Sequence, residues 1–102
     1  MNFRFIMVEK KLTDYQIEIL NVIVKDSIKT ISYHNPQTQL RNITKGKSLE
    51  ETLDALRFLE SDFGVLALDP TLRFGIFSKC GYRVNLDQAK NLHDSYVKEK
   101  ER

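Results

Sequence analysis

The sequence predicts a single domain of the α+β class, and three observations support this prediction. The chain has 102 residues, a length that suits one domain (residues 1–102) with one hydrophobic core. Three segments begin with residues that cap helices, at Thr13, Ser48 and Asn85. A β-rich run over residues 3–8 and a hairpin pattern over residues 65–77 predict strands.

The composition is that of an ordinary globular protein, with 41% hydrophobic and 29% charged residues. A net charge of +2 does not by itself indicate an anionic partner. No apolar run reaches the roughly 18 residues that a membrane span requires. We therefore expect an intracellular protein, cytoplasmic or nucleoid-associated, without membrane contact. Cys80 is the single cysteine and has no metal ligands at suitable spacing, so we expect neither a metal nor a cofactor.

The first helix is predicted to begin at Thr13, because Thr13 and Gln16 form a capping box. It is predicted to end before Pro36, since proline disfavours the helical conformation in the preceding residue, Asn35. Its apolar stripe is broader than a one-sided surface helix needs, so a homodimer through this helix is expected. The stripe comprises Ile17, Leu20, Val24, Ile28 and Ile31, broadened by Tyr15, Ile19, Val22 and Ile23.

The middle of the chain predicts a short helix over residues 37–44, a basic turn, and a second main helix. The basic turn is Lys45, Gly46 and Lys47. Ser48 and Glu51 form a second capping box, and Gly64 is expected to end the helix. The apolar face of this helix is predicted to contain Leu49, Leu53, Leu56, Leu59 and Phe63.

Beyond this helix, the sequence predicts a hairpin and a third main helix. The strands are predicted at residues 65–68 and 73–77, with the turn at residues 69–72 because proline suits the second turn position. The last helix should begin at Asn85, capped with the help of Gln88. Its apolar positions are Leu86, Ala89, Leu92, Tyr96 and Val97.

The order long helix, short helix, basic turn, capped helix and hairpin resembles the winged-helix family over about residues 12–78. The most specific part is the run from Ser48 through Leu59 to Gly64, Val65 and Leu66. The resemblance implies a winged-helix-like α+β fold with three main helices, a hairpin and a short N-terminal strand. It also implies a non-catalytic protein that binds duplex DNA and regulates transcription.

Residue by residue, the resemblance implies which side chains contact DNA. The helix after the basic turn would enter the major groove, with Ser48, Glu51, Thr52 and Ala55 facing bases. The cations before the helix and in the hairpin would contact phosphates. The complete predicted nucleic-acid-binding set is Arg41, Lys45, Lys47, Ser48, Thr52, Arg73 and Lys79.

The charge distribution supports a second hypothesis. Residues 48–72 contain one base, Arg57, and many acids, and phosphates would repel those at the start of the helix. The alternative is a protein-interaction module that binds a peptide or partner protein in a groove, without binding DNA. Phe58 and Phe77 fall outside the apolar faces and are its predicted partner-binding residues.

An alternative architecture is suggested by the two ends of the chain. Residues 4–26 align with residues 73–99 with one gap, as two strand–helix units related by a pseudo-twofold axis. A groove between two such units would suit a peptide.

An enzyme is not expected, because His34 and His93 lack the nucleophile and orienting group that catalysis requires.

Overall fold

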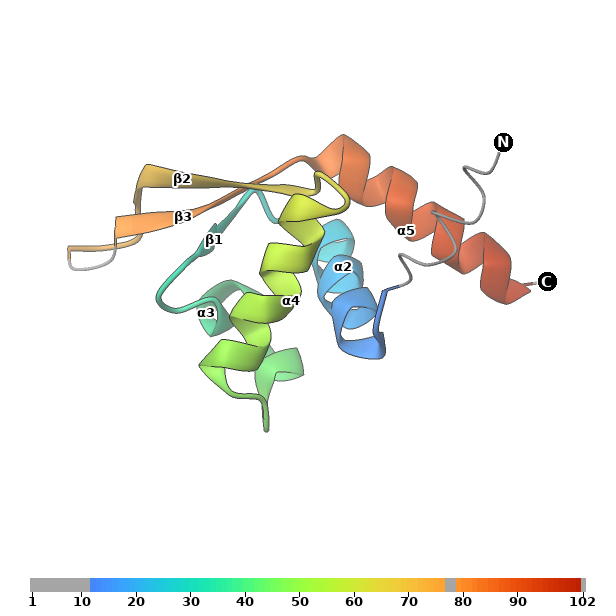
Figure 1. Ribbon diagram of the computed structural model, residues 1–102, viewed down its shortest axis with the longest axis horizontal. Helices are drawn as coiled ribbons and strands as arrows, with labels where there is room; N and C mark the ends of the chain where they lie inside the picture. The colour runs from blue at the N-terminus through green and yellow to red at the C-terminus, as the bar shows by residue number, and fades with distance from the viewer. Residues whose placement is uncertain (1–11, 77–78, 102) are drawn as a thin grey trace.

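The computed structural model describes residues 12–76 and 79–101, and side chains as far as residue 96 (Figure 1). The described part is an α+β structure with four α-helices and a three-stranded antiparallel sheet. The predicted strand over residues 3–8 lies outside the described residues. In chain order the elements are α2 (Asp14–Asp26), β1 (Thr30–Ser32), α3 (Gln37–Leu40), the 3₁₀ helix η1 (Arg41–Thr44), α4 (Leu49–Ser61), β2 (Leu66–Arg73), β3 (Lys79–Val84) and α5 (Leu86–Glu101).

The sheet has the strand order β1-β3-β2, so the last strand in the chain is the central one. Ile31 pairs with Tyr82, and Tyr82 pairs with Leu68 on its other side. Ile31 and Tyr82 are almost completely buried. The β2–β3 hairpin extends beyond the helices on the left of Figure 1, while α5 leads away on the right.

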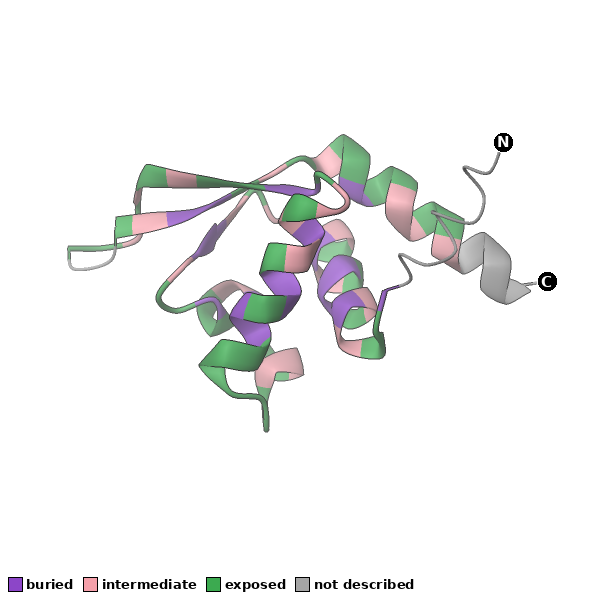
Figure 2. Ribbon diagram, viewed as in Figure 1, coloured by how far each residue is buried: buried purple, intermediate pink, exposed green. Residues whose placement is uncertain are grey.

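Helix α2 lies at the centre of the core, where it contacts α3, α4 and α5. It buries Ile19, Leu20 and Ile23 completely, and α4 contributes the equally buried Leu56 and Leu59 (Figure 2). A helix with neighbours on several sides needs a broad apolar surface. The broad stripe of α2 is thus explained within one chain, and it no longer argues for the homodimer predicted through this helix.

The prediction that the first helix continues to Asn35 is wrong, because the helix ends at Asp26. Ser27 adopts the left-handed conformation with φ 51°. Its N–H donates to Val24 O at 3.4 Å, and the Ile28 N–H donates to Ile23 O at 3.0 Å. These are the two hydrogen bonds of a Schellman motif, which usually has glycine at the left-handed position. The next residues form β1.

The predicted position of the hairpin turn is also wrong. Strand β2 continues through residues 69–72, and the turn falls between Arg73 and Lys79, which pair with each other. Asp69 pairs with Gly81, so β2 has two more residues than β3 between the two pairs and forms a bulge. Pro70 is tolerated there, because it lies on an edge strand where no partner needs its missing N–H.

The predictions based on helix caps are confirmed. Both capping boxes are complete, that of Thr13 with Gln16 and that of Ser48 with Glu51. The Asn85 side chain accepts a hydrogen bond from the Gln88 N–H at 3.1 Å. The short helix over residues 37–44 exists as α3 followed by η1.

The end of α4 agrees with the role predicted for Gly64. This residue has φ 64°, and its N–H donates to Glu60 O at 3.3 Å.

The pseudo-twofold alternative depends on residues 3–8, which lie outside the described residues. Its second unit also needs a strand at residues 73–77, whereas the strand before α5 is β3.

Candidate nucleic-acid interface

The basic turn leads directly into a firmly capped α4. The Glu51 N–H donates to Ser48 Oγ at 3.0 Å, and Glu51 Oε1 accepts from the Ser48 N–H at 3.1 Å. The hydrogen bond from the Ser48 backbone lowers the pKa of Glu51. Glu51 therefore has a structural role in the cap, where an ionised carboxylate also complements the helix dipole.

One cation of the basic turn is held in place by an aromatic ring. Lys47 Nζ lies 4.7 Å from the centroid of the Tyr15 ring, at a distance suited to a cation–π contact. The hydroxyl of Tyr15 is 2.7 Å from Thr52 Oγ1, which also donates to Ser48 O at 3.1 Å. The start of α4 is thereby tied to α2.

The same contacts exclude Thr52 from the predicted DNA-binding set. Its exposed fraction is only 2%, and Ala55, one turn further, is also buried. Both face the core because this side of α4 packs toward α2. By contrast Arg41, Lys45, Lys47 and Ser48 are exposed, as the prediction requires.

A polar pocket of about 330 Å³ adjoins the start of α4. It brings three residues of the predicted binding set, Lys47, Ser48 and Thr52, next to the loop between β1 and α3. The remaining lining side chains are mostly neutral and polar, so the pocket adds hydrogen-bonding groups but little charge. They are His34, Asn35, Gln37, Thr44 and Leu49.

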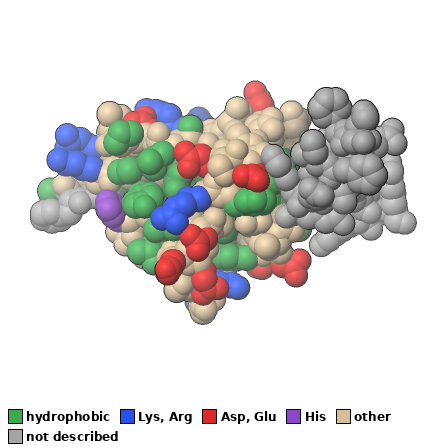
Figure 3. Space-filling model, in the orientation of Figure 1, with side chains coloured by type: hydrophobic (Ala, Val, Ile, Leu, Met, Phe, Trp, Pro, Cys, Tyr) green, Lys and Arg blue, Asp and Glu red, His purple; other side chains and the backbone are tan. Residues whose placement is uncertain are grey.

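The exposed side of α4 is mainly acidic. Glu50 and Asp54 lie on it, and the one base, Arg57, donates to Asp54 Oδ1 at 2.8 Å. A hydrogen bond with the Tyr33 side chain raises the pKa of Arg57. Figure 3 shows several acidic side chains on the face of the molecule where α4 lies in Figure 1. This surface would repel phosphates.

The end of the β2–β3 hairpin has the opposite character. Arg73 and Lys79 pair across the two strands, and both are exposed. Between them lies Ile76, whose side chain is 84% exposed. Lys and Arg side chains are visible at this end of the molecule in Figure 3. Arg73, Ile76 and Lys79 are hereafter called the hairpin end.

Arg73 and Lys79 were predicted from the sequence to contact DNA, whereas the exposure of Ile76 was not predicted. Residues 73–77 were expected to form a strand, where Ile76 would have shared a packed face with Phe74. A signal was present in the sequence, because Gly75 is a turn residue directly before Ile76. Gly75 has φ 88° in the structure.

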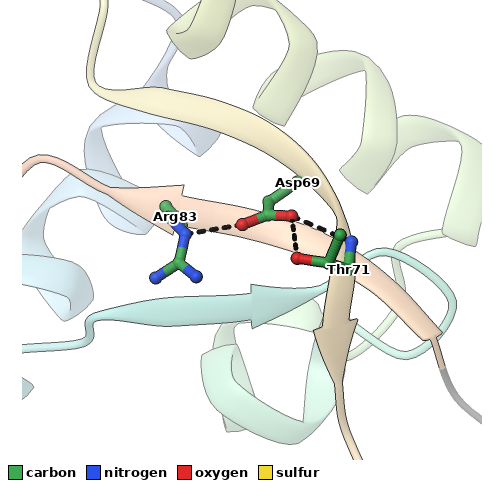
Figure 4. Close-up of polar contacts among 3 residues, drawn as sticks. All are labelled: Asp69, Thr71 and Arg83. Atoms are coloured by element: carbon green, nitrogen blue, oxygen red, sulfur yellow. Dashed lines mark hydrogen bonds and ion pairs between the residues drawn. The ribbon is translucent and has the colours of Figure 1, made fainter.

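A polar cluster stabilises the bulge in the hairpin (Figure 4). Asp69 Oδ1 accepts from the Thr71 hydroxyl at 2.6 Å and from the Thr71 N–H at 2.8 Å. Asp69 Oδ2 accepts from Arg83 Nε at 2.6 Å. The bonds from Thr71, followed by that from Arg83, lower the pKa of Asp69 to about 2. The charge of Arg83 is therefore partly neutralised within the sheet.

On each outer edge of the sheet, one backbone N–H is bonded by a side chain. On β1, the Ser32 N–H donates to Gln39 Oε1 at 2.9 Å. On β2, the Leu68 N–H donates to Glu60 Oε2 at 3.2 Å, and Pro70 has no N–H. Edges treated in this way resist the addition of another strand. These two bonds disfavour strand addition at Ser32 and at Leu68.

The two predicted partner-binding aromatics do not form an exposed pair in the described structure. Phe58 is only partly exposed, because it packs against the core and lies edge-to-face with Phe63 at 5.5 Å. Phe77 lies outside the described residues. Phe58 is therefore better explained as a peripheral core residue.

The predicted set thus divides into two basic regions separated by an acidic helix face.

Within residues 12–76 and 79–101, no group of three potential ligands is placed to hold a metal ion. No helix in the described part has the length and apolar character of a membrane span. In comparisons with models of protein families, curated proteins and solved structures, no match to the chain was found.

Proposed function

We propose that this chain is a small, intracellular, non-catalytic DNA-binding protein of winged-helix type that acts in transcriptional control. The observation that carries the proposal is the projecting β2–β3 hairpin directly after α4, with Arg73 and Lys79 opposite each other at its end. The element order and the strand order β1-β3-β2 support it. In this proposal the hairpin is the wing.

The basic regions would supply the binding energy. Arg41, Lys45 and Lys47 before α4 are exposed, as are Arg73 and Lys79 on the hairpin. Each phosphate that they neutralise releases counterions, and this release makes binding depend on salt. The acids on α4 oppose close approach of the helix to the backbone, so we expect weak binding by one chain, which dimerisation would strengthen.

The proposal is tested by fluorescence anisotropy of a mixed-sequence DNA duplex from low to physiological salt. Wild type should bind, and the plot of log affinity against log salt should have a clear negative slope. The double variant Arg73→Ala/Lys79→Ala should bind more weakly, with a slope shallower by about 2. Lys45→Ala/Lys47→Ala should reduce the slope similarly.

A matched control removes the same charge from other surfaces. Lys25 and Lys90 are exposed on α2 and α5, so Lys25→Ala/Lys90→Ala should retain most of the wild-type slope. Absence of duplex binding by wild type at low salt would refute the proposal. If the plot of log affinity against log salt has the same slope for all three double variants, the named residues do not contact DNA.

A second candidate function is favoured by the acidic side of α4. Glu50 and Asp54 form an exposed surface that suits a basic partner protein. The double variant Glu50→Gln/Asp54→Gln separates the two functions. It should bind DNA more tightly than wild type if α4 approaches phosphates, and it should weaken capture of a basic partner if α4 is a protein-binding surface.

A further inference from the structure

The polar pocket beside the start of α4 is large enough for a small ligand. Its volume of about 330 Å³ lies near the lower end of the range in which proteins bind small molecules. Its lining comes from the loop between β1 and α3, from η1, and from the basic turn with the start of α4. In the loop, the His34 ring is held edge-to-face against Tyr33, with 5.5 Å between the ring centroids.

The charge of the pocket lining is positive, and the cation that supplies it is held in place. Among the described residues that line the pocket, Lys47 is the one lysine or arginine, and there is no aspartate or glutamate. Lys47 Nζ lies 4.7 Å from the centroid of the Tyr15 ring, and the Tyr15 hydroxyl lies 2.7 Å from Thr52 Oγ1. A cation that is positioned beforehand loses less conformational freedom when a ligand binds. The pocket therefore favours an anion.

The neutral side chains of the pocket offer both a hydrogen-bond donor and an acceptor. Gln37 Nε2 donates to Asn35 Oδ1 at 3.3 Å. Within the described part of the chain, the Asn35 NH₂ group makes no hydrogen bond, so it is available to donate to a ligand. The Thr44 hydroxyl donates to Arg41 O at 2.7 Å, so toward a ligand its oxygen can only accept. A ligand hydroxyl, which both donates and accepts, matches these two groups.

We propose that this pocket binds a small phosphorylated sugar or polyol. Lys47 would contact the phosphate, and Asn35 and Thr44 would bond the hydroxyl groups. Lysine suits phosphate as a point charge, whereas a carboxylate is matched best by the planar fork of arginine, which the described lining lacks. This site goes beyond the proposed DNA-binding function and does not depend on it.

The site does not depend on the free N–H groups that a helix start usually offers to anions. The Ser48 N–H already donates to Glu51 Oε1, and the Glu51 N–H donates to Ser48 Oγ. The capping box therefore uses both groups. Recognition of the phosphate depends on the side chain of Lys47 instead.

The test is a titration of the full chain with ribose 5-phosphate, glucose 6-phosphate and glycerol 3-phosphate, followed in two-dimensional amide NMR spectra. At least one of them should bind saturably and shift resonances mainly within residues 34–37 and 44–52. Ribose lacks the phosphate, and inorganic phosphate lacks the hydroxyl groups. Each should bind at least about tenfold more weakly than the sugar phosphate, because it loses one set of hydrogen bonds.

A matched pair of variants tests the cation. Lys47→Gln should weaken binding of the sugar phosphate by about tenfold or more, because a charge-assisted hydrogen bond is lost. Lys45→Gln removes the same charge from the same turn, but Lys45 does not line the pocket. This control should keep its affinity within about twofold, since solvent and salt screen an exposed charge. Both lysines are exposed, so thermal unfolding should show both variants folded as wild type is.

Saturable binding at these residues, weakened by Lys47→Gln but not by Lys45→Gln, supports the proposed site. If none of the three sugar phosphates shifts these resonances at millimolar concentration, the proposal is overturned. It is also overturned if inorganic phosphate binds as tightly as the sugar phosphate, or if the two variants weaken binding equally. The titration contains no DNA, so its failure leaves the proposed function standing, and a failure of duplex binding in the anisotropy experiment leaves this site standing.

Discussion

Replacing Gly81 with alanine tests how closely three segments approach one another at the hairpin. Gly81 lies in β3, between β1 and β2. A Cβ at this position would lie 2.6 Å from the carbonyl oxygen of Ile31 and 2.8 Å from Cζ of Phe74. Both distances are shorter than normal van der Waals contact, so either β1 or the Phe74 ring has to move.

The expected cost follows from these two contacts. Forcing an extra methyl group into a packed site typically costs about 1 to 3 kcal/mol. Alanine regains about 0.5 to 1 kcal/mol relative to glycine, because it loses less backbone entropy on folding. With the middle of each range, the net loss in free energy of unfolding is about 1.3 kcal/mol, which lowers the melting temperature by roughly 5 to 10 °C.

The assay is urea and thermal unfolding of Gly81→Ala, Phe74→Ala and the double variant. Removing the Phe74 ring relieves one clash and leaves that with Ile31, so Gly81→Ala should cost less in the Phe74→Ala background. Gly46→Ala is the control. Gly46 has φ 79° and an added Cβ would have no atom within 4 Å, so its cost of about 1 kcal/mol should be additive with Phe74→Ala.

Two results would contradict this account. If Gly81→Ala is as stable as wild type, β1, β3 and the Phe74 ring do not approach one another as closely as these distances require. If the effects of Gly81→Ala and Phe74→Ala simply add, the ring does not rest on Gly81. In that case the folded-back position of Phe74, which leaves Ile76 as the exposed residue of the hairpin end, would be wrong.

Three further predictions concern pH and the sheet edge. The pKa of Asp69 is about 2 in the folded protein and near 3.8 otherwise, so its stabilisation is complete above pH 4 and is lost as the pH falls toward 2. Asp69→Asn should flatten the dependence of stability on pH in that window. If urea unfolding shows that both proteins lose the same free energy of unfolding between pH 4 and pH 2, this prediction is contradicted. Burial raises the pKa of Tyr82 from 10 to about 12, so stability should fall between pH 10 and 12 in wild type but less in Tyr82→Phe. Ionisation of all tyrosines near pH 10 in an absorbance titration would refute that cause. Glu60→Ala leaves the Leu68 N–H without its acceptor, so self-association should increase in sedimentation experiments, whereas Glu60→Gln, which retains an acceptor oxygen, should remain as wild type. Equal association of the two variants would show that the hydrogen bond does not protect the edge.

The predictions that succeeded were local ones. A capping box involves residues three positions apart, and its hydrogen bonds form regardless of the rest of the fold. Thr13 and Ser48 were therefore assigned correctly from neighbouring residues alone. The left-handed turn at Gly64 is also local, because glycine adopts that conformation without a steric penalty.

The predictions that failed depended on distant partners. Ser27 ends α2 in a conformation for which glycine is the usual residue, so the sequence contained no recognisable stop signal. Strand β1 has only three residues, and its pairing with β3 joins Ile31 to Tyr82 across much of the chain. The bulge of β2 likewise depends on its register with β3, which allows Pro70 to lie within a strand.

The exposure of the candidate site residues was predicted in part for the same reason. Charge is a property of the sequence, so the cations before α4 and on the hairpin could be named from it, and the structure leaves them exposed. Burial depends on how helices are rotated against one another. Thr52 was therefore assigned to the surface although α4 turns it toward Tyr15, and Ile76 was assigned to a packed strand although the turn exposes it.

The amino-acid sequence alone was sufficient for the α+β class, the three capped helix starts and the alternation of basic and acidic segments, because each depends on residue type and short spacing. The tertiary structure was needed to establish where α2 ends, how the three strands are ordered, which side of α4 faces solvent and which apolar residue projects from the hairpin end. Those features depend on hydrogen bonds and packing between residues that are far apart in the chain. A local sequence pattern does not contain the energies of these contacts.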